Sequence, residues 1–282
     1  MTPAMLNNPP AAFLPKMTQA GLKPTYAVTA YDERGLAREV NIAGETPLTL
    51  FVDGRELVTL MTLGTFPEAL AIGYLRNQRF IERIDELVEV CVDWTRERVD
   101  VKTARGIENW EARLQHRTVT TGCGQGTVFS CSINKTYEIH LPALTLTQSY
   151  LYHLLALLAE YNEVYRQAGA VHGCALCRAG EILAFVEDVG RHNAADAIAG
   201  LMWLHQWSGQ DMVFYTTGRL TSEIVMKTAY MGIPVLLSRS GVTQMGLELA
   251  TEIGVTMIAR AKGQHFLIYN GVKNIIFDAS PV

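Results

Sequence analysis

The stretch Glu187-Asp188-Val189-Gly190-Arg191-His192-Asn193-Ala194 (residues 187–194) joins the end of an expected strand to the start of an expected helix. The first amides of a helix have no partner within it and carry partial positive charge, so a helix start favours a phosphate or a carboxylate. Arg191 would add a bidentate contact to such an anion, with His192 and Asn193 beside it. The same residues also fit an ordinary turn in which Asp188 caps the helix and Arg191 lies in solvent.

A second stretch of the same kind follows at Thr216-Thr217-Gly218-Arg219-Leu220-Thr221-Ser222-Glu223. Gly218 allows close approach to the backbone, Arg219 is a second cation, and Lys227 lies one helical turn further on. The hydroxyl groups could instead only cap the helix, and Lys227 could point to solvent. Together the two stretches predict a site for an extended anionic ligand at the carboxyl ends of neighbouring strands.

Strands and helices are predicted to alternate around these two stretches. The predicted strands are 170–178, 182–186, 212–216, 235–238, 255–258 and 266–269, and the predicted helices are 149–169, 191–206, 222–231 and 243–251. Alternation at this spacing predicts a three-layer α/β lobe with helices on both faces of the sheet.

The first half of the chain has a different pattern. Strands are predicted at 26–31, 46–52, 57–62, 87–94 and 97–103, with one helix at 67–77 that begins at Pro67. The predicted division is a disordered tail at 1–22, a small α+β lobe at 23–144 that carries a cysteine loop, and an α/β lobe at 145–282.

Composition excludes several classes of protein. The 282 residues have a net charge of −4, which argues against a general nucleic-acid-binding protein. No apolar stretch reaches about 18 residues, so no transmembrane helix is expected. The five cysteines are an odd, low number, which fits a reducing cytoplasm and not a disulfide framework.

The stretch Arg260-Ala261-Lys262-Gly263-Gln264-His265 connects the last two predicted strands. Its two cations, its glycine and two side chains able to bind a base edge or a phosphate make it a candidate ligand contact. A solvated hairpin tip has the same composition, so both interpretations stay open.

Cys123 lies among three glycines in Thr120-Thr121-Gly122-Cys123-Gly124-Gln125-Gly126. Glycine loses the most backbone entropy when it is fixed, so this stretch favours a mobile loop. An exposed thiol there suits a sulfur atom that has to reach two places, and Cys123 is the predicted catalytic residue. A hairpin turn that happens to contain a cysteine is the alternative.

His172, Cys174 and Cys177 resemble a set of zinc ligands. The segment reads as a strand, where side chains alternate between faces, so Cys177 should point away from the other two. Cys174 and Cys177 are therefore predicted to be small core residues. Cys91 is predicted to be buried in a strand, and Cys131 is close enough in sequence to meet Cys123.

The motifs together resemble the formate dehydrogenase accessory sulfurtransferase (FdhD) family over about residues 25–269. The resemblance rests on 187–194 with Asp196 behind it, on Gly218-Arg219 with Ser222-Glu223 and Lys227, on Gly232-Ile233-Pro234-Val235 with Ser238-Arg239-Ser240, and on the loop at Cys123.

The resemblance implies a cytoplasmic homodimer with a cytidine-deaminase-like three-layer lobe that needs no zinc. Sulfur would come from a cysteine desulfurase as a persulfide on Cys123. It would pass to a molybdenum or tungsten bis-molybdopterin guanine dinucleotide, bound as the sulfur acceptor, before insertion of that cofactor into formate dehydrogenase. No permanent cofactor, metal, nucleic acid or membrane is expected. The predicted cofactor-binding residues of lobe 145–282 are Arg260, Ala261, Lys262, Gly263, Gln264, His265, Arg191, His192, Asn193, Gly218, Arg219 and Lys227.

The chain departs from the family pattern at two places. The family commonly has Cys-x-x-Cys in the central loop, whereas Gly126 stands here in place of the second thiol. Arg260 replaces the usual aromatic residue at the start of the cofactor connection. The alternatives to sulfur transfer are a cofactor-binding chaperone and a zinc-dependent deaminase-like hydrolase that uses His172, Cys174 and Cys177.

Overall fold

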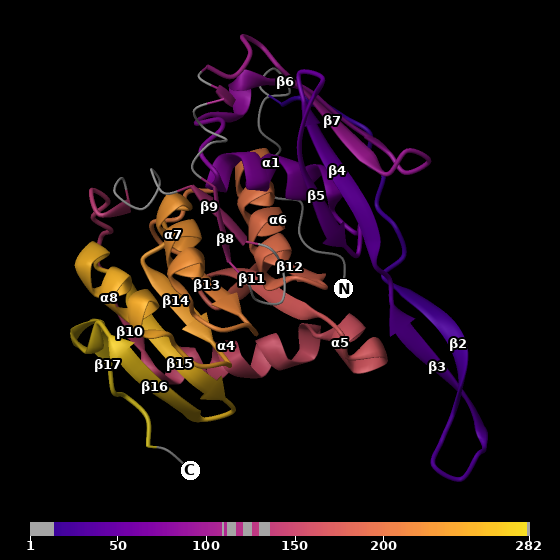
Figure 1. Ribbon diagram of the computed structural model, residues 1–282. Coiled ribbons are helices and arrows are strands. Elements are labelled where there is room, and N and C mark those ends of the chain that lie inside the picture. The colour runs from indigo at the N-terminus through magenta and orange to yellow at the C-terminus, as the bar shows by residue number, and fades with distance from the viewer. Residues whose placement is uncertain (1–13, 109, 112–116, 121–125, 130–135, 281–282) are drawn as a thin grey trace.

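The computed structural model describes residues 14–108, 110–111, 117–120, 126–129 and 136–280. The chain forms a mixed α/β structure in which two sheets lie at opposite ends of a central layer of helices (Figure 1). A two-stranded arm, β2 (Thr25–Tyr31) and β3 (Ala37–Ala43), projects from this body.

The larger sheet has six strands in the order β12-β11-β13-β14-β15-β16. Its strands are β11 (His172–Arg178), β12 (Glu181–Asp188), β13 (Val213–Thr216), β14 (Val235–Ser238), β15 (Thr256–Lys262) and β16 (His265–Asn270). The neighbours β13, β14 and β15 are parallel, while β11 and β16 run against them and β12 runs with them. The carboxyl ends of β12, β13, β14 and β15 therefore meet at one edge, together with the starts of β11 and β16.

Helices cover both faces of this sheet, as the alternation of elements predicts. On one face lie α6 (Arg191–Leu204), α7 (Ser222–Tyr230) and α8 (Gln244–Ile253), and on the other lies α4 (Gln148–Tyr161) (Figure 1). Cys174 and Leu176 belong to the first interface, whereas Ala175 and Cys177 belong to the second. This lobe is a three-layer α/β arrangement, and its likeness to cytidine deaminases stays a prediction.

The single helix predicted at 149–169 is wrong, because the chain breaks between α4 and α5 (Glu163–Ala168). The buried Asn162 at the break donates to the carbonyl oxygen of Leu158 at 2.8 Å. The carboxylate of Glu187 accepts the first amides of α5, from Val164 and Tyr165, at 2.9 Å each. The spacing of apolar residues in 149–169 cannot reveal hydrogen bonds to a residue as distant in sequence as Glu187, so the break was not predicted.

The smaller sheet has five strands in the order β1-β6-β7-β4-β5. They are β1 (Lys16–Met17), β4 (Thr46–Val52), β5 (Arg55–Thr62), β6 (Leu87–Asp93) and β7 (Arg98–Thr103). β1 pairs in parallel with β6, and Thr18 and the Ala20 amide both bind the Glu68 carboxylate. The prediction of disorder for 1–22 is therefore wrong from Lys16 onward, since strand pairing and a distant carboxylate hold this segment.

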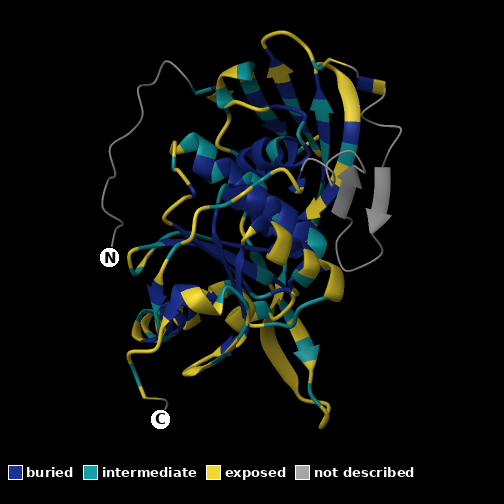
Figure 2. Cartoon of the chain, turned by 90° about the vertical axis from the view of Figure 1, so that its left-hand side faces the viewer, coloured by how far each residue is buried: buried dark blue, intermediate teal, exposed yellow. Residues whose placement is uncertain are grey.

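The helix α1 (Pro67–Asn77) joins the two sheets by packing against α6. A Cβ on Gly73 would lie 1.7 Å from the carbonyl oxygen of Asp196, and one on Gly200 would lie 1.9 Å from that of Ala69. The two backbones touch, which only glycine permits at these points. One buried cluster consequently runs from Leu50 in the small sheet to Phe214 in the large one, and buried residues fill the centre of the molecule (Figure 2).

The remaining elements are short. They are η2 (Ile84–Glu86), η3 (Val272–Asn274), the pair β8 (Arg117–Thr120) and β9 (Gly126–Phe129), and the pair β10 (Leu146–Thr147) and β17 (Ile275–Ile276). Among the helices of the described part of the chain, none is both long and apolar enough to cross a membrane.

Candidate functional site

The stretches predicted to bind an anion lie along one edge of the six-stranded sheet. Stretch 187–194 follows β12, stretch 216–223 follows β13, and stretch 260–265 ends β15 and begins β16. His172 begins β11 at the same edge, and Arg239 directly follows β14. Residues that are distant in sequence are thus brought to the position where open α/β sheets bind ligands.

The turn before α6 is occupied by a carboxylate of the protein itself. Asp188 accepts hydrogen bonds from the Gly190 amide at 3.2 Å and from the Asn193 side chain at 3.0 Å. It also accepts the Thr62 hydroxyl at 2.5 Å and the Leu63 amide at 3.3 Å, both at the end of β5. Burial raises the pKa of Asp188 to about 6, although these bonds favour its ionised form. This stretch therefore ties the large sheet to the small one.

His192 and Lys227 belong to a buried ionic network. The Lys227 ammonium lies 2.7 Å from both oxygens of Asp196 and 3.7 Å from Glu223. Asn77 of α1 donates to Asp196 at 2.7 Å, and His192 Nδ1 lies 3.2 Å from Glu223 Oε1. Burial, helped by the Lys227 charge, lowers the pKa of His192 well below its usual range, so this imidazole is neutral. Contrary to the prediction, neither His192 nor Lys227 faces the surface of the site.

Three arginines gather around His172. Burial lowers the pKa of His172, and the charges of Arg191, Arg239 and Arg219 lower it further. A Cβ on Gly218 would lie 2.6 Å from Cδ of Arg191, which shows that the arginine stem lies directly on this glycine. The predicted close approach at Gly218 is therefore to a side chain of the protein. Arg219 and Arg239 are exposed, whereas Arg191, also predicted to bind the ligand, is buried with 5% of its surface exposed.

We call the edge of the six-stranded sheet that carries Arg191, Arg219 and Arg239 the cationic edge. Hydrogen bonds hold its loops in place. Ser238 donates to the carbonyl oxygen of Gly218 at 2.7 Å and accepts the Ser240 amide at 2.9 Å. Thr217 Oγ1 lies 3.4 Å from His172 Nδ1 and accepts the Gly173 amide at 3.0 Å. The loops after β13 and β14 are thus fixed, while the Arg219 and Arg239 side chains extend from them.

Arg239 and Tyr165 were missed as site residues. The Arg239 guanidinium lies 5.3 Å from the centre of the exposed Tyr165 ring, a cation–π arrangement. Arg239 could have been found from its place after the parallel strand next to β13. Tyr165 could not have been found from the sequence, because its position near Arg239 depends on the helix break at Asn162.

The stretch 260–265 is mostly strand. β15 runs to Lys262, so Arg260 and Ala261 lie in it and only Gly263 and Gln264 form the tip. Ala261 is buried toward α4, and the other five residues are exposed. The Arg260 amide donates to the carbonyl oxygen of Ser240 at 2.9 Å. The hairpin tip thus continues the cationic edge, and both interpretations made from the sequence fit this position.

Cys123 and Cys131 lie outside the described residues. The flanking strands β8 and β9 pair in antiparallel fashion, with Thr120 opposite Gly126. The pairing therefore brings together the two ends that flank residues 121–125, and the role of Cys123 stays a prediction.

The zinc hypothesis is contradicted by the geometry. Cys174 and Cys177 point to opposite faces of the sheet, so they cannot bind one ion together with His172. Burial raises the pKa of each thiol to about 12, which fits the prediction that both are core residues. No cluster of three His, Cys, Asp or Glu side chains suited to a metal occurs among the described residues. Cys91, predicted to be buried, is only partly so.

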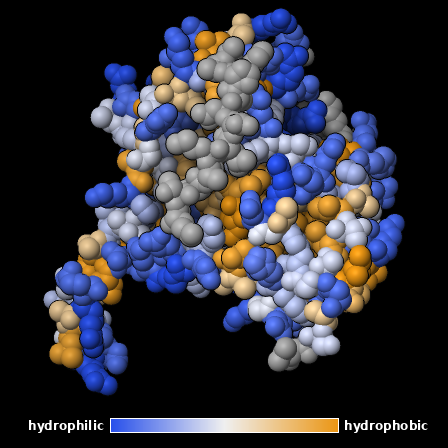
Figure 3. All heavy atoms as spheres, turned by 180° about the vertical axis from the view of Figure 1, so that it is seen from behind, coloured by the Kyte–Doolittle hydropathy of each residue, from blue (hydrophilic) through white to orange (hydrophobic). Residues whose placement is uncertain are grey.

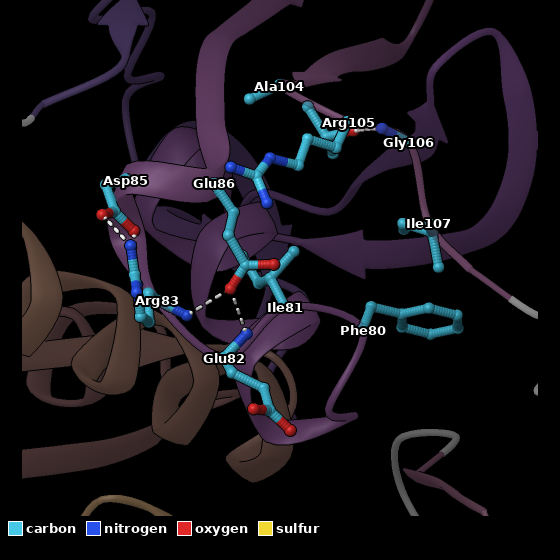
Figure 4. A pocket seen from close by; sticks show the side chains of 11 residues that line it. Phe80, Ile81, Glu82, Arg83, Asp85, Glu86, Ala104, Arg105, Gly106 and Ile107 are labelled. Atoms are coloured by element: carbon cyan, nitrogen blue, oxygen red, sulfur yellow. Dashed lines mark hydrogen bonds and ion pairs between the residues drawn. The ribbon is translucent and has the colours of Figure 1, made fainter.

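A separate pocket of about 460 Å³ lies between η2 and the end of β7 (Figure 4). Arg83 is bonded to Asp85, and Glu86 accepts the amides of Glu82 and Arg83 at 2.9 and 2.7 Å. These charged groups bind one another, and no predicted site residue lines the pocket.

Comparison with known proteins gives the affiliation of the chain. Residues 43–276 match the model of the FdhD/NarQ family. The chain belongs to this family. Among its relatives, the protein named sulfur carrier protein FdhD of Geobacillus kaustophilus is 30% identical over 244 residues, covering 86% of this chain and 93% of that protein. The protein of the same name from Listeria monocytogenes serotype 4b is 28% identical over 249 residues, covering 86% and 95%.

A solved structure with a similar sequence agrees with the fold. The crystal structure of a chain from Desulfotalea psychrophila, described as a formate dehydrogenase accessory protein, matches with a TM-score of 0.71 and 26% identity. The match covers 89% of this chain and 98% of that one. The family affiliation inferred from the motifs is therefore confirmed.

Proposed function

We propose that this chain is a sulfur carrier required for formate dehydrogenase activity. A cysteine desulfurase supplies the sulfur, Cys123 carries it, and a molybdenum bis-molybdopterin guanine dinucleotide receives it before insertion into formate dehydrogenase. The observation that carries the proposal is the cationic edge, where the exposed Arg219 and Arg239 follow the ends of β13 and β14, beside the buried Arg191 that follows β12. Guanidinium groups favour phosphates, and a guanine dinucleotide brings several of them.

The loading step balances without an oxidant. The Cys123 thiolate attacks the outer sulfur of the desulfurase persulfide, the S–S bond of the donor breaks, and the donor cysteine leaves as a thiolate. Thiolate is the reactive form, and a free cysteine has a pKa of about 8.5. Release of the carried sulfur as sulfide needs two electrons. A second thiol supplies them by attacking the inner sulfur and forming a disulfide with Cys123.

The missing second loop cysteine bears on that last step. Gly126 cannot supply the thiol, so it comes from Cys131 or from an external thiol such as glutathione. The proposal also includes a homodimer in the cytoplasm and a cytidine-deaminase-like α/β lobe, as the family resemblance implies.

Persulfide loading tests the proposal directly. The full chain is incubated with a cysteine desulfurase and cysteine, and the intact mass is measured without reductant. Wild type should gain one sulfur atom, about 32 Da. The Cys123→Ala variant should gain none, and the Cys91→Ala variant should gain as much as wild type. No gain in wild type, or equal gain in Cys123→Ala, would contradict the carrier role.

A chaperone that binds the cofactor without sulfur transfer is the second candidate, and the loss of the second loop thiol favours it. It predicts that Cys123→Ala still supports formate dehydrogenase activity in cells that lack the wild-type gene. Loss of activity in a Cys123→Ala variant that still binds guanosine diphosphate would exclude it.

A further inference from the structure

The β2–β3 arm exposes an apolar face. Pairing sets Tyr26 opposite Ile42 and Val28 opposite Val40 on this face. Tyr26, Ile42 and Val40 are 49%, 48% and 40% exposed. The arm points away from the body, and apolar side chains show on its surface beside hydrophilic ones (Figure 3). A two-stranded hairpin is marginally stable alone in water, so a face of this kind is expected to be covered.

The body of the same chain covers little of the arm. Its main neighbour is α5, and Thr25 on the opposite face donates to Gln167 of that helix at 3.3 Å. The charges of the arm mostly bind one another. Arg38 donates to Asp32 at 3.0 and 2.9 Å, and Thr29 donates to Glu39 at 2.7 Å. A partner selected by charge is therefore disfavoured, and an apolar surface is favoured.

The side chains on the apolar face of the arm are complementary in size to the same face of a second copy of this chain. Along the apolar face, β2 carries Tyr26, Val28 and Ala30, from large at the base to small at the tip. Two such faces can be related by a two-fold axis that lies between them and runs perpendicular to the strands. This axis places the base of each arm over the tip of the arm of the other copy. Tyr26 of each copy then lies over Ala30 of the other, and Val28 meets Val28 at the axis. Interfaces of this isologous kind are the commonest in homodimers.

The other strand completes the match. β3 carries Ile42, Val40 and Arg38 along the same face, opposite Tyr26, Val28 and Ala30 in turn. The axis sets Val40 against Val40, and Ile42 over the aliphatic stem of Arg38, while the guanidinium stays at the rim with Asp32. We propose that the β2–β3 arms of two chains pack face to face in this way, as a small sandwich of two sheets about 10 Å apart.

This inference deepens the proposed homodimer by naming its surface, and it does not depend on the sulfur chemistry. The mass of the full chain is measured by light scattering over a range of concentrations. Wild type should be a dimer. Val40→Lys, which puts an ammonium at the axis, should raise the dimer dissociation constant by about 100-fold or more. Asn41→Lys, on the opposite face of the same strand, should leave it unchanged.

A size exchange tests the geometry itself. Ala30→Tyr should weaken the dimer because two large rings then meet, and the double variant Tyr26→Ala/Ala30→Tyr should restore it. Circular dichroism verifies that each variant is folded. A monomeric wild type overturns the inference together with the proposed homodimer. A dimer that Val40→Lys leaves intact overturns the arm surface alone, and failure of the double variant to restore the dimer overturns the base-over-tip arrangement.

Discussion

The turn before α6 and the loop after β13 have similar local sequences, yet the structure uses them in opposite ways. Each joins a strand to a helix and carries a glycine and an arginine. In the first, Asp188 and Asn193 bind the end of β5, and His192 lies in a buried network. In the second, Arg219 is exposed, whereas Arg191 of the first turn is buried.

The difference lies in what covers each turn. The small sheet lies over the start of α6, so polar groups there bind the protein itself. The described part of the small sheet supplies no such bond to Arg219 or Arg239. Changes at the covered turn should therefore reduce stability, and changes at the open loop should reduce ligand binding. Variants at covered and at open positions test this difference.

The largest effect is expected for Lys227→Met. Removal of Lys227 takes away the cation that is paired with the buried Asp196 carboxylate, and loss of one partner of a buried ion pair costs about 3–5 kcal/mol of unfolding free energy. Urea unfolding followed by circular dichroism measures the loss. Lys262→Met is the matched control, because this exposed lysine lies at the open end of the same sheet edge. Equal losses in the two variants would remove the contrast between covered and open positions.

A smaller, pH-dependent effect is expected for Asp188→Asn. The folded pKa of about 6 exceeds the unfolded value of about 3.9, so the contribution of this carboxyl to stability is fully present below pH 4 and is lost as the pH rises through 6. The stability difference between wild type and Asp188→Asn should fall over that window by up to about 3 kcal/mol, at about 1.4 kcal/mol per pKa unit.

Urea unfolding of both proteins between pH 4.5 and 7.5 gives this difference. The sign of its change is the prediction. A difference that grows with pH would mean that the fold favours the ionised carboxylate, and the turn before α6 would then resemble an anion site after all.

The smallest effect on stability is expected for Arg219→Ala and Arg239→Ala. Both side chains are exposed, so the unfolding free energy should change by no more than about 0.5 kcal/mol. Affinity for guanosine diphosphate should fall by about tenfold in each variant, because a charge-assisted phosphate contact is lost. Calorimetric titration measures the affinity, with Arg34→Ala on the arm as the control. Unchanged affinity in both variants would remove the cationic edge as the phosphate contact.

Helices and strands were predicted well where neighbouring residues in the sequence determine them. The helix 67–77 has its predicted limits because Pro67 starts it and apolar residues recur at helical spacing. The strands 46–52 and 235–238 also have the limits expected from their apolar patterns. Tertiary contacts decided the rest. The break at Asn162 depends on Glu187, and the strand at Lys16 depends on β6.

The positions of the three predicted stretches were foreseen from the sequence, but the burial of their side chains was not. The stretches at 187, 216 and 260 do meet at one sheet edge, since strand ends follow from the alternation of elements. Burial of His192 and Lys227 could not be inferred, because it results from α1 and α6 lying in contact. Arg239 was quoted only as part of a family motif and not as a ligand contact, and the role of Cys123 stays a prediction.

The glycine contact between α1 and α6 limits how this protein can be divided. Because the two backbones touch at Gly73 and Gly200, the face of α6 is shaped to receive another helix rather than water. A fragment made of residues 145–282 alone would present that face, with buried residues such as Ile198 beside it, to solvent. The two sheets are therefore one unit for expression and for domain exchange between relatives, and a chimera should carry α1 together with α6.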